Sequence, residues 1–339
     1  MSFCAGPMWR ATSCRHRRPL ADGARCALGG LELGRRKGED ISGWLIVDKP
    51  VAMTSAGAVA MARRLFGARK TGHAGTLDPL ATGVLPIAFG EATKTIPYVV
   101  AADKHYSFTI RWGESRTTDD AEGGVLETSS VRPSEAAMRS ALPRFVGTIN
   151  QRPPAFSAIK IAGKRAYDLA RADEPLTLAE RPVKIGRFEL TGVVDGDHAR
   201  FEVECGKGTY VRSLARDLAL ALDTVGHVVQ LRRHRVGAFR EDSAISLADL
   251  AEVGHSAVHK QHLIPVETAL DDIPALALTE EEAERLRHGR AVEVLRTSDR
   301  ALLGQVGDGA IIWAQSAGRA VALTRVDGHQ IRPVRILNL

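Results

Sequence analysis

The chain has 339 residues, of which 44% are hydrophobic and 25% are charged, and its formal net charge is +6. This composition is typical of a globular protein and excludes a disordered chain or a fibrous repeat. No apolar run approaches the roughly 20 residues that a membrane-spanning helix needs. Four cysteines do not make a disulfide framework in a chain of this length. Without a secretory signal segment, we expect a cytoplasmic protein with reduced thiols.

The first 40 residues differ in composition from the rest of the chain. They contain eight basic and four acidic residues and three of the four cysteines. We expect a disordered basic extension. A mitochondrial presequence, a misassigned start codon and a species-specific extension all remain open as explanations of it. Cys14 and His16 lack the spacing of a structural zinc site, so the sequence predicts no metal.

Ordered structure is expected from Gly43, where an apolar run predicts a buried strand at 44–47. The elements expected after it, in chain order, are a helix over 54–66 capped by Thr54 or Ser55, a loop over 71–83, a strand that begins at Tyr106, a helix over 134–145 capped by Ser134, strands over 183–194 and 199–205, a helix over 210–222 capped by Thr209, a strand from Leu231 to Val236, and a helical segment over 245–252.

Two further segments stand apart in composition. Residues 151–182 begin and end with Arg-Pro pairs and contain several lysines and arginines, which predicts an inserted, mobile, basic flap. Beyond residue 270 we expect a helix over 279–288 and three short strands over 301–306, 310–315 and 319–326. This pattern is typical of a small appended β-barrel. Residues 271–339 contain nine basic and ten acidic residues, so this part of the chain is nearly neutral.

The loop over 71–83 concentrates the chemistry. Three glycines and one proline in thirteen residues predict a tight loop defined by its backbone. His73 and Asp78 are its only strongly reactive side chains. Asp78 can be interpreted either as a turn or helix-cap residue or as a functional carboxylate.

Three more positions carry similar alternatives. Arg212 falls near the third position of a predicted helix, where a cation opposes the helix dipole, so it is either a surface arginine or the partner of a carboxylate. Tyr106 is either a core aromatic or a site residue. The basic run over 231–235 is either an exposed strand end or a phosphate-binding rim. Lys207, between two glycines, suits a phosphate contact.

Taken in order, these motifs closely resemble the TruB-type tRNA pseudouridine-55 synthases over residues 41–270. The motifs that carry the resemblance are Gly43-Trp44-Leu45-Ile46-Val47-Asp48-Lys49-Pro50, Gly72-His73-Ala74-Gly75-Thr76-Leu77-Asp78-Pro79, Lys104-His105-Tyr106, Pro153-Pro154-Ala155-Phe156-Ser157-Ala158-Ile159-Lys160, Lys207-Gly208-Thr209-Tyr210-Val211-Arg212 and Leu231-Arg232-Arg233. Ala74 and Phe156 stand where many members have Thr and Tyr.

The resemblance implies an α+β fold. The catalytic core over 41–270 would have a mixed, largely antiparallel sheet, and the flap over 151–182 would close on RNA. A small PUA-like β-domain over 271–339 would contact the acceptor arm of tRNA.

The resemblance also implies the reaction, an isomerisation of uridine 55 in the T loop of tRNA to its C-glycoside without any cofactor. Asp78 would be the essential carboxylate, and attack at C1′ and loss of the 2′ proton through a glycal are both open routes. Arg212 would pair with Asp78, because a buried carboxylate needs a cation to stay ionised. Tyr106 would stack on the flipped base.

Four further residues are implied as substrate-binding. His73 would fill the space left by the flipped nucleotides, and Leu231 would line the uracil pocket. Lys49 would support the catalytic loop, and Tyr210 would lie beside the Asp–Arg pair.

The resemblance implies tRNA as the partner and a monomer that needs no protein partner. Two other functions compete with this one. A guide-RNA-dependent rRNA synthase would need protein partners, and the absence of a long Lys-rich tail favours the stand-alone type. The second alternative is a tRNA-folding chaperone, for which catalysis is secondary.

Overall fold

The computed structural model describes residues 38–157, 160–161, 164–165, 178–252 and 260–339. The expectation of a disordered extension therefore falls on residues that, up to residue 37, lie outside the described part. Much of the predicted flap, including residues 166–177, also lies outside it.

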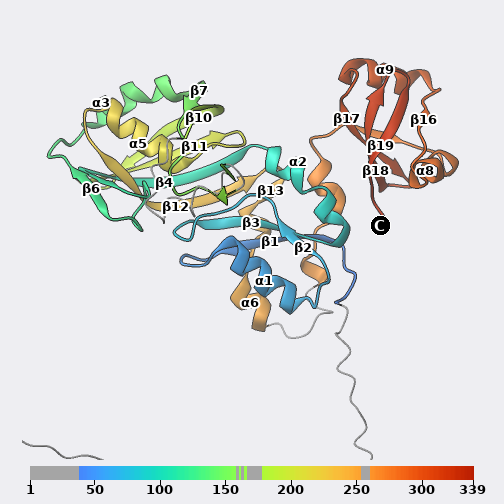
Figure 1. Ribbon diagram of the computed structural model, residues 1–339, viewed down its shortest axis with the longest axis horizontal. Coiled ribbons are helices and arrows are strands. Elements are labelled where there is room, and N and C mark those ends of the chain that lie inside the picture. The colour runs from blue at the N-terminus through green and yellow to red at the C-terminus, as the bar shows by residue number, and fades with distance from the viewer. Residues whose placement is uncertain (1–37, 158–159, 162–163, 166–177, 253–259) are drawn as a thin grey trace, which may run out of the picture. The chain divides into compact units, whose positions relative to one another are not determined.

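A ten-stranded sheet forms the centre of the larger part of the chain (Figure 1). Its main path runs in the order β14-β1-β3-β12-β4-β11-β10-β7, with β2 paired to β3 and β13 paired to β12. The pairs β1–β14 and β3–β12 are parallel, and the others are antiparallel. The predicted mixed, largely antiparallel sheet is thus confirmed. Its strands are β1 (Gly43–Lys49), β2 (Thr71–His73), β3 (Thr82–Phe89), β4 (Lys104–Trp112), β7 (Gly147–Gln151), β10 (Arg181–Val193), β11 (His198–Cys205), β12 (Gly226–Val236), β13 (Phe239–Arg240) and β14 (Ile245–Ser246).

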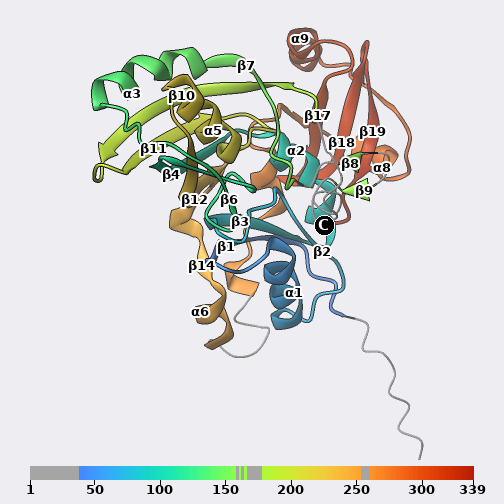
Figure 2. The ribbon, with the colours of Figure 1, turned by 60° about the vertical axis from the view of Figure 1, so that its left-hand side comes forward.

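Helices pack on this sheet in two groups. Helices α3 and α5 pack against β10, β4 and β12, whereas α1 and α6 pack near β1 and β2 (Figures 1 and 2). The helices of this part are α1 (Ser55–Leu65), α2 (Ile96–Ala101), α3 (Glu135–Ala141), α5 (Val211–Ala221) and α6 (Leu247–Glu252), with 3₁₀ turns η1 (Gly90–Lys94), η2 (Leu142–Phe145), η3 (Glu241–Ser243), η4 (Lys260–His262) and η5 (Val266–Leu270). Two small hairpins pair β5 (Glu114–Arg116) with β6 (Val125–Thr128) and β8 (Lys160–Ile161) with β9 (Lys164–Arg165).

Aromatic side chains build the core between the sheet and its helices. Phe108 on β4 clusters with Phe188 and Phe201: its ring centroid is 6.0 and 5.6 Å from theirs, which are 5.7 Å apart. Leu214 and Leu218 on α5 are fully buried in the same cluster. Such packing fixes the position of α5 against β4 and β12, and this matters because all three elements carry residues of the predicted site.

The C-terminal part has its own five-stranded sheet, which confirms the predicted small β-domain. The strand order is β15-β17-β18-β19-β16, formed by β15 (Ala275–Ala277), β16 (Val292–Glu293), β17 (Ile311–Ser316), β18 (Arg319–Asp327) and β19 (Gln330–Ile336). Helices α8 (Glu280–Arg287) and α9 (Thr297–Val306) accompany it. Thr279 and Glu282 form a reciprocal capping box at the start of α8.

Two local predictions are wrong, and one strand was missed. Residues 301–306 belong to helix α9 instead of a strand, because Ala301 and the two leucines after it are strong helix formers that follow an acidic first turn. Thr209 does not cap α5: its hydroxyl donates to the Gly206 carbonyl, and Tyr210 occupies the cap position. Strand β19 was missed because Pro333 and its charged neighbours hide the alternation.

Two predicted caps are confirmed. Thr54 accepts the Gly57 amide at the start of α1, and Ser134 accepts the Ala137 amide at the start of α3. In the described ranges, no helix is long and apolar enough to cross a membrane.

Candidate active site

Five of the seven predicted site residues line one cavity of about 460 Å³. They are Asp78, Tyr106, Tyr210, Arg212 and Leu231. They come from the loop between β2 and β3, from β4, from the start of α5 and from β12. Segments separated by more than a hundred residues therefore meet at one place in the fold.

The loop that carries Asp78 is fixed by its backbone. The Leu77 amide donates to the Ser55 hydroxyl over 2.8 Å, and that hydroxyl donates back to the Leu77 carbonyl over 3.0 Å. The Ala81 amide donates to the Asp78 carbonyl. Gly83, at the end of the loop, has φ +98°, and a Cβ there would lie 2.2 Å from the Arg233 carbonyl oxygen. Glycine is required at this close approach of β3 and β12.

Arg212 holds Asp78 by a bidentate ion pair. Its Nε donates to Asp78 Oδ2 over 2.9 Å and its Nη2 donates to Oδ1 over 3.1 Å. The Arg212 side chain is 5% exposed and the Asp78 side chain is 32% exposed. A buried guanidinium thus fixes both oxygens of a carboxylate that remains open to the cavity. The structure excludes the interpretation of Arg212 as a surface residue.

The remaining donors of Arg212 are also satisfied. Nη1 donates to the Thr118 carbonyl over 2.7 Å, and Nη2 also donates to the Phe156 carbonyl over 3.0 Å. Phe156 lies in the described first part of the predicted flap over 151–182. The guanidinium therefore connects Asp78 with the loop after β5 and with the base of that segment.

A second carboxylate next to Arg212 was missed by the sequence analysis. Asp120 is 2% exposed, and its Oδ2 lies 3.6 Å from Arg212 Nε. Its Oδ1 accepts hydrogen bonds from the Thr118 hydroxyl and the Glu122 amide. The only signal in the sequence was the pair of adjacent acids Asp119 and Asp120. In the structure they lie in a turn in which Asp119 adopts φ +58°.

Gln151 is a second missed residue. Its side chain is buried, and it pairs with the backbone of Tyr210 in both directions: its Nε2 donates to the Tyr210 carbonyl over 3.1 Å, and its Oε1 accepts the Tyr210 amide over 2.8 Å. This pair fixes the start of α5 against the end of β7. Burial raises the pKa of the Tyr210 phenol.

Tyr106 and Leu231 line the cavity from the neighbouring strands β4 and β12. Tyr106 lies on β4 opposite Arg233 of β12, and Leu231 lies opposite Phe108. Burial raises the pKa of the Tyr106 phenol, against the opposing effect of the Arg233 charge. Leu231 is 7% exposed and supplies an apolar surface.

Lys49 and His73 do not line the cavity. Lys49 is fully buried, and its ammonium donates to the carbonyls of Pro50, Met53 and Pro79, at 2.7, 2.7 and 3.3 Å. Pro79 follows Asp78, so Lys49 holds the loop from behind. Burial lowers the pKa of Lys49 to about 8. His73 lies on β2, where burial and the Arg233 charge lower its pKa.

The basic run over 231–235 divides between the two faces of β12. Arg232 pairs with Asp48 over 3.0 Å and also with Glu241. Arg233 is 1% exposed and points into the protein. Neither arginine presents a free guanidinium to a phosphate. Lys207 is exposed, and its predicted phosphate contact stays a prediction.

Comparison with known sequences identifies the family. The family model described as "TruB family pseudouridylate synthase (N terminal domain)" matches residues 63–211, and that described as "tRNA pseudouridylate synthase B C-terminal domain" matches residues 212–271. The chain belongs to the TruB family of pseudouridylate synthases. The resemblance found in the sequence motifs is confirmed.

Close relatives cover nearly the whole chain. The tRNA pseudouridine synthase B of Gluconacetobacter diazotrophicus is 52% identical over 89% of this chain and 99% of its own length. That of Caulobacter vibrioides is 51% identical over 90% of this chain and 99% of its own length.

Solved structures support the fold. The archaeal box H/ACA sRNP Nop10-Cbf5 complex contains a chain that matches with a TM-score of 0.66 and 23% identity, over 87% of this chain and 86% of that one. A Cbf5-Nop10-Gar1 complex gives 0.67 and 24%, over 87% and 84%. This likeness shows that the chain shares its α+β fold with these chains.

Proposed function

We propose that this chain isomerises uridine 55 in the T loop of tRNA to pseudouridine. The observation that carries the proposal is the Asp78–Arg212 pair at the wall of the 460 Å³ cavity. Membership of the TruB family supports the reaction class, and relatives named tRNA pseudouridine synthase B support tRNA as the substrate.

The reaction is an intramolecular rearrangement. The N1–C1′ glycosidic bond breaks, the uracil turns, and C5 forms a new bond to C1′; C5 loses its proton and N1 gains one. No electron acceptor or group donor is consumed. We therefore assign no cofactor and no metal to this chemistry.

Asp78 is the group suited to act at the ribose. Its carboxylate is partly open to the cavity while Arg212 fixes both of its oxygens. A fixed orientation lowers the cost of reaching the reacting geometry. Both attack on C1′ and assistance to loss of the 2′ proton are compatible with this position.

The base would be received by the sheet wall. Tyr106 offers an aromatic face for stacking and Leu231 an apolar surface for uracil. Tyr210 lies next to Arg212 and adds a second phenol to the lining. Flipping the nucleotide out of the folded T loop costs a few kcal/mol of unstacking, which contacts of this kind offset.

The two other predicted substrate-binding residues take supporting places. Lys49 orders the backbone after Asp78, which fits the predicted support of the catalytic loop. His73 lies on β2, outside the cavity lining, and we assign it to the nucleotides that flank the flipped uridine.

We also propose that the chain acts as a monomer in the cytoplasm and without a protein partner. The domain limits proposed are 41–270 for the catalytic core, with residues 151–182 as the RNA-clamping flap, and 271–339 for an RNA-binding domain.

Tritium release tests the function. A tRNA transcript labelled with tritium at C5 of uridine is incubated with the protein, and the matched control transcript carries cytidine at position 55. Stoichiometric release from the first transcript and none from the control is expected. Mapping the product with a carbodiimide that stops primer extension at pseudouridine locates the site. Release from the control transcript would contradict the assignment of position 55.

A further inference from the structure

Arg233 is a buried cation that the mechanism above does not use. It lies on β12 between β3 and β4, opposite Gly83 on one side and Tyr106 on the other. Only 1% of it is exposed. Its neighbour Arg232 has a side chain that is 34% exposed and forms ion pairs with two acids. Alternation along the strand thus separates two arginines into opposite environments.

The guanidinium of Arg233 binds the catalytic loop. Its Nε donates to the Val84 carbonyl on β3 over 2.8 Å, and its Nη2 donates to the Gly75 carbonyl over 3.0 Å. Gly75 lies three residues before Asp78 and has φ +91°, and a Cβ there would lie 3.3 Å from Arg233 Nη1. The loop therefore approaches this side chain closely at a glycine.

The same guanidinium also reaches Tyr106. A side-chain hydrogen bond from Arg233 and its positive charge both favour the phenolate, against the larger effect of burial, which raises the pKa of Tyr106. One side chain thus contacts both the loop of the reactive carboxylate and the aromatic residue assigned to the base.

The charge of Arg233 has no acidic partner in the described ranges, since no ion pair between it and a carboxylate occurs there. Burying a cation without a counter-charge is costly, and hydrogen bonds to neutral carbonyls offset only part of that cost. A residue that only filled space would be better replaced by an apolar side chain. This cost indicates a function for the guanidinium.

We infer that Arg233 is a positioning residue that fixes the Tyr106 hydroxyl and the Gly75–Asp78 loop relative to each other. Its planar fork has enough donors to hold both, and a lysine could hold only part of the arrangement. This inference rests on the proposed roles of Asp78 and Tyr106.

The test compares the variants Arg233→Met and Arg233→Lys with the control variant Arg232→Met. Arg232 lies on the same strand as Arg233, but its side chain points to the opposite face of the sheet. Single-turnover tritium release at saturating tRNA, tRNA affinity and thermal unfolding are measured for each. Arg233→Met should lose about 100-fold in rate with tRNA affinity within about threefold, because the loss concerns orientation more than binding. Arg233→Lys should recover part of the rate, and Arg232→Met should stay within about threefold of the original protein.

A double-mutant cycle with Tyr106→Phe separates positioning from general structural damage. If Arg233 acts through Tyr106, Arg233→Met costs a smaller factor in the Tyr106→Phe background than in the original chain. Equal factors in both backgrounds would overturn the link to Tyr106. Should Arg233→Met not fold, Arg233→Lys carries the same cycle.

A folded Arg233→Met protein that turns over within threefold of the original would overturn the whole inference. Failure of the proposed function gives a different result, because the original protein itself would then release no tritium.

Discussion

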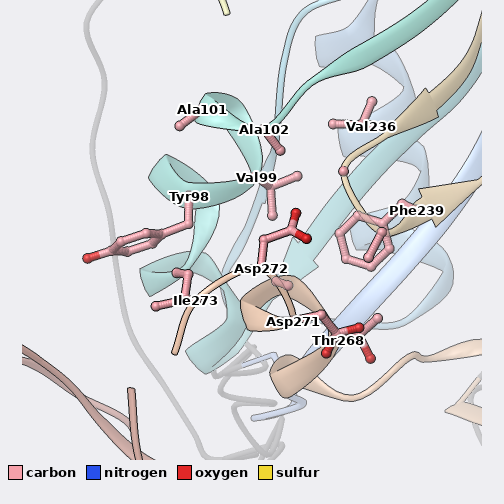
Figure 3. A pocket seen from close by; sticks show the side chains of 13 residues that line it. Tyr98, Val99, Ala101, Ala102, Val236, Phe239, Thr268, Asp271, Asp272 and Ile273 are labelled. Atoms are coloured by element: carbon pink, nitrogen blue, oxygen red, sulfur yellow. The ribbon is translucent and has the colours of Figure 1, made fainter. Parts of the chain in front are cut away.

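Helix α2 and strand β12 each line two hollows of opposite character. Towards the catalytic loop, Val100 of α2 and Leu231 of β12 line the 460 Å³ cavity with Asp78. On the other side, Val99 and Val236 line a hollow of about 250 Å³ (Figure 3). The two hollows share α2 and β12, but η5 completes the second one, whereas the Asp78 loop, β4 and α5 complete the first.

The second hollow is almost wholly apolar. Figure 3 shows Val99, Ala101, Val236 and Phe239 around it. Its two acids, Asp271 and Asp272, are exposed and form no ion pair in the described ranges. Burial and the neighbouring charge of Asp272 raise the pKa of Asp271. Nothing there fixes a charged group in a chosen orientation.

The Asp78 cavity contains the opposite arrangement. Two carboxylates share one buried guanidinium, and a second buried guanidinium contacts the loop and the phenol. Chemistry depends on charges held in fixed positions out of water, and a hollow of suitable size and apolarity is not sufficient for it.

The largest effect is expected for Asp78→Asn. The substitution keeps the shape and removes the charge, so the single-turnover rate should fall by at least about 10⁴-fold, as for other essential groups of this kind. The tRNA affinity should change little, because one cavity side chain adds little to phosphate contacts. Tritium release and filter binding measure the two quantities. Measurable product from the pure variant would show that the charge of Asp78 is not essential.

The second largest loss of rate is expected for Arg212→Ala. It leaves the Asp78 and Asp120 carboxylates close together without their shared cation, which breaks a buried ion pair. We expect a rate loss of about 10²–10³-fold and a shift of the acidic limb of the pH–rate profile to higher pH, because like charges disfavour joint ionisation. Arg212→Lys should restore part of the rate, since an ammonium cannot bind both oxygens in the same way. An unchanged pH profile for Arg212→Ala would contradict the role of the pair.

Lys49 supplies the third test, on stability. In the folded chain burial lowers the pKa of Lys49 from 10.5 to about 8. Between those two values the unfolded chain keeps a proton that the folded chain has released, so stability rises with pH. The unfolding free energy of the original protein minus that of Lys49→Met should therefore increase from about pH 8 towards pH 10.5. Denaturant titrations across this range measure it, and a difference independent of pH would refute the lowered pKa.

The contrast between the two hollows also explains what the sequence could predict. Most strands and helices of the larger part could be predicted from glycine turns and strand alternation, because these are local signals. The mixed sheet and the pair of Asp78 with Arg212 came from the resemblance to the TruB-type family, since the residues alone left Arg212 open between a surface residue and a carboxylate partner. Asp120 and Gln151 were missed because their importance arises only when β5, β7 and α5 meet. Arg233 was classed with Arg232, since the sequence does not show which face of β12 is closed.

Local propensity also misled in the C-terminal part. Residues 301–306 combine leucine and valine with a glycine, a pattern that also fits a short strand. The helix formers and the acidic first turn favour α9, in which Leu303 packs into the small core. Thr209 was a plausible cap by residue type, but the chain begins α5 one residue later. Boundaries of this kind depend on tertiary contacts.

The smallest effect is expected for Ala269→Val, which partly fills the apolar hollow of Figure 3 from η5. Two extra methyl groups in a hollow can be accommodated at a change of about 1 kcal/mol in the free energy of unfolding, in either direction, depending on how well they fit. The turnover rate at saturating tRNA should stay within about twofold of the original, because no charge near Asp78 moves. Thermal unfolding and tritium release measure the two effects on the same preparation. A folded Ala269→Val protein that lost more than tenfold in rate would break the comparison. It would mean that α2 transmits the packing of the apolar hollow to Val100 and Lys104 in the cavity wall.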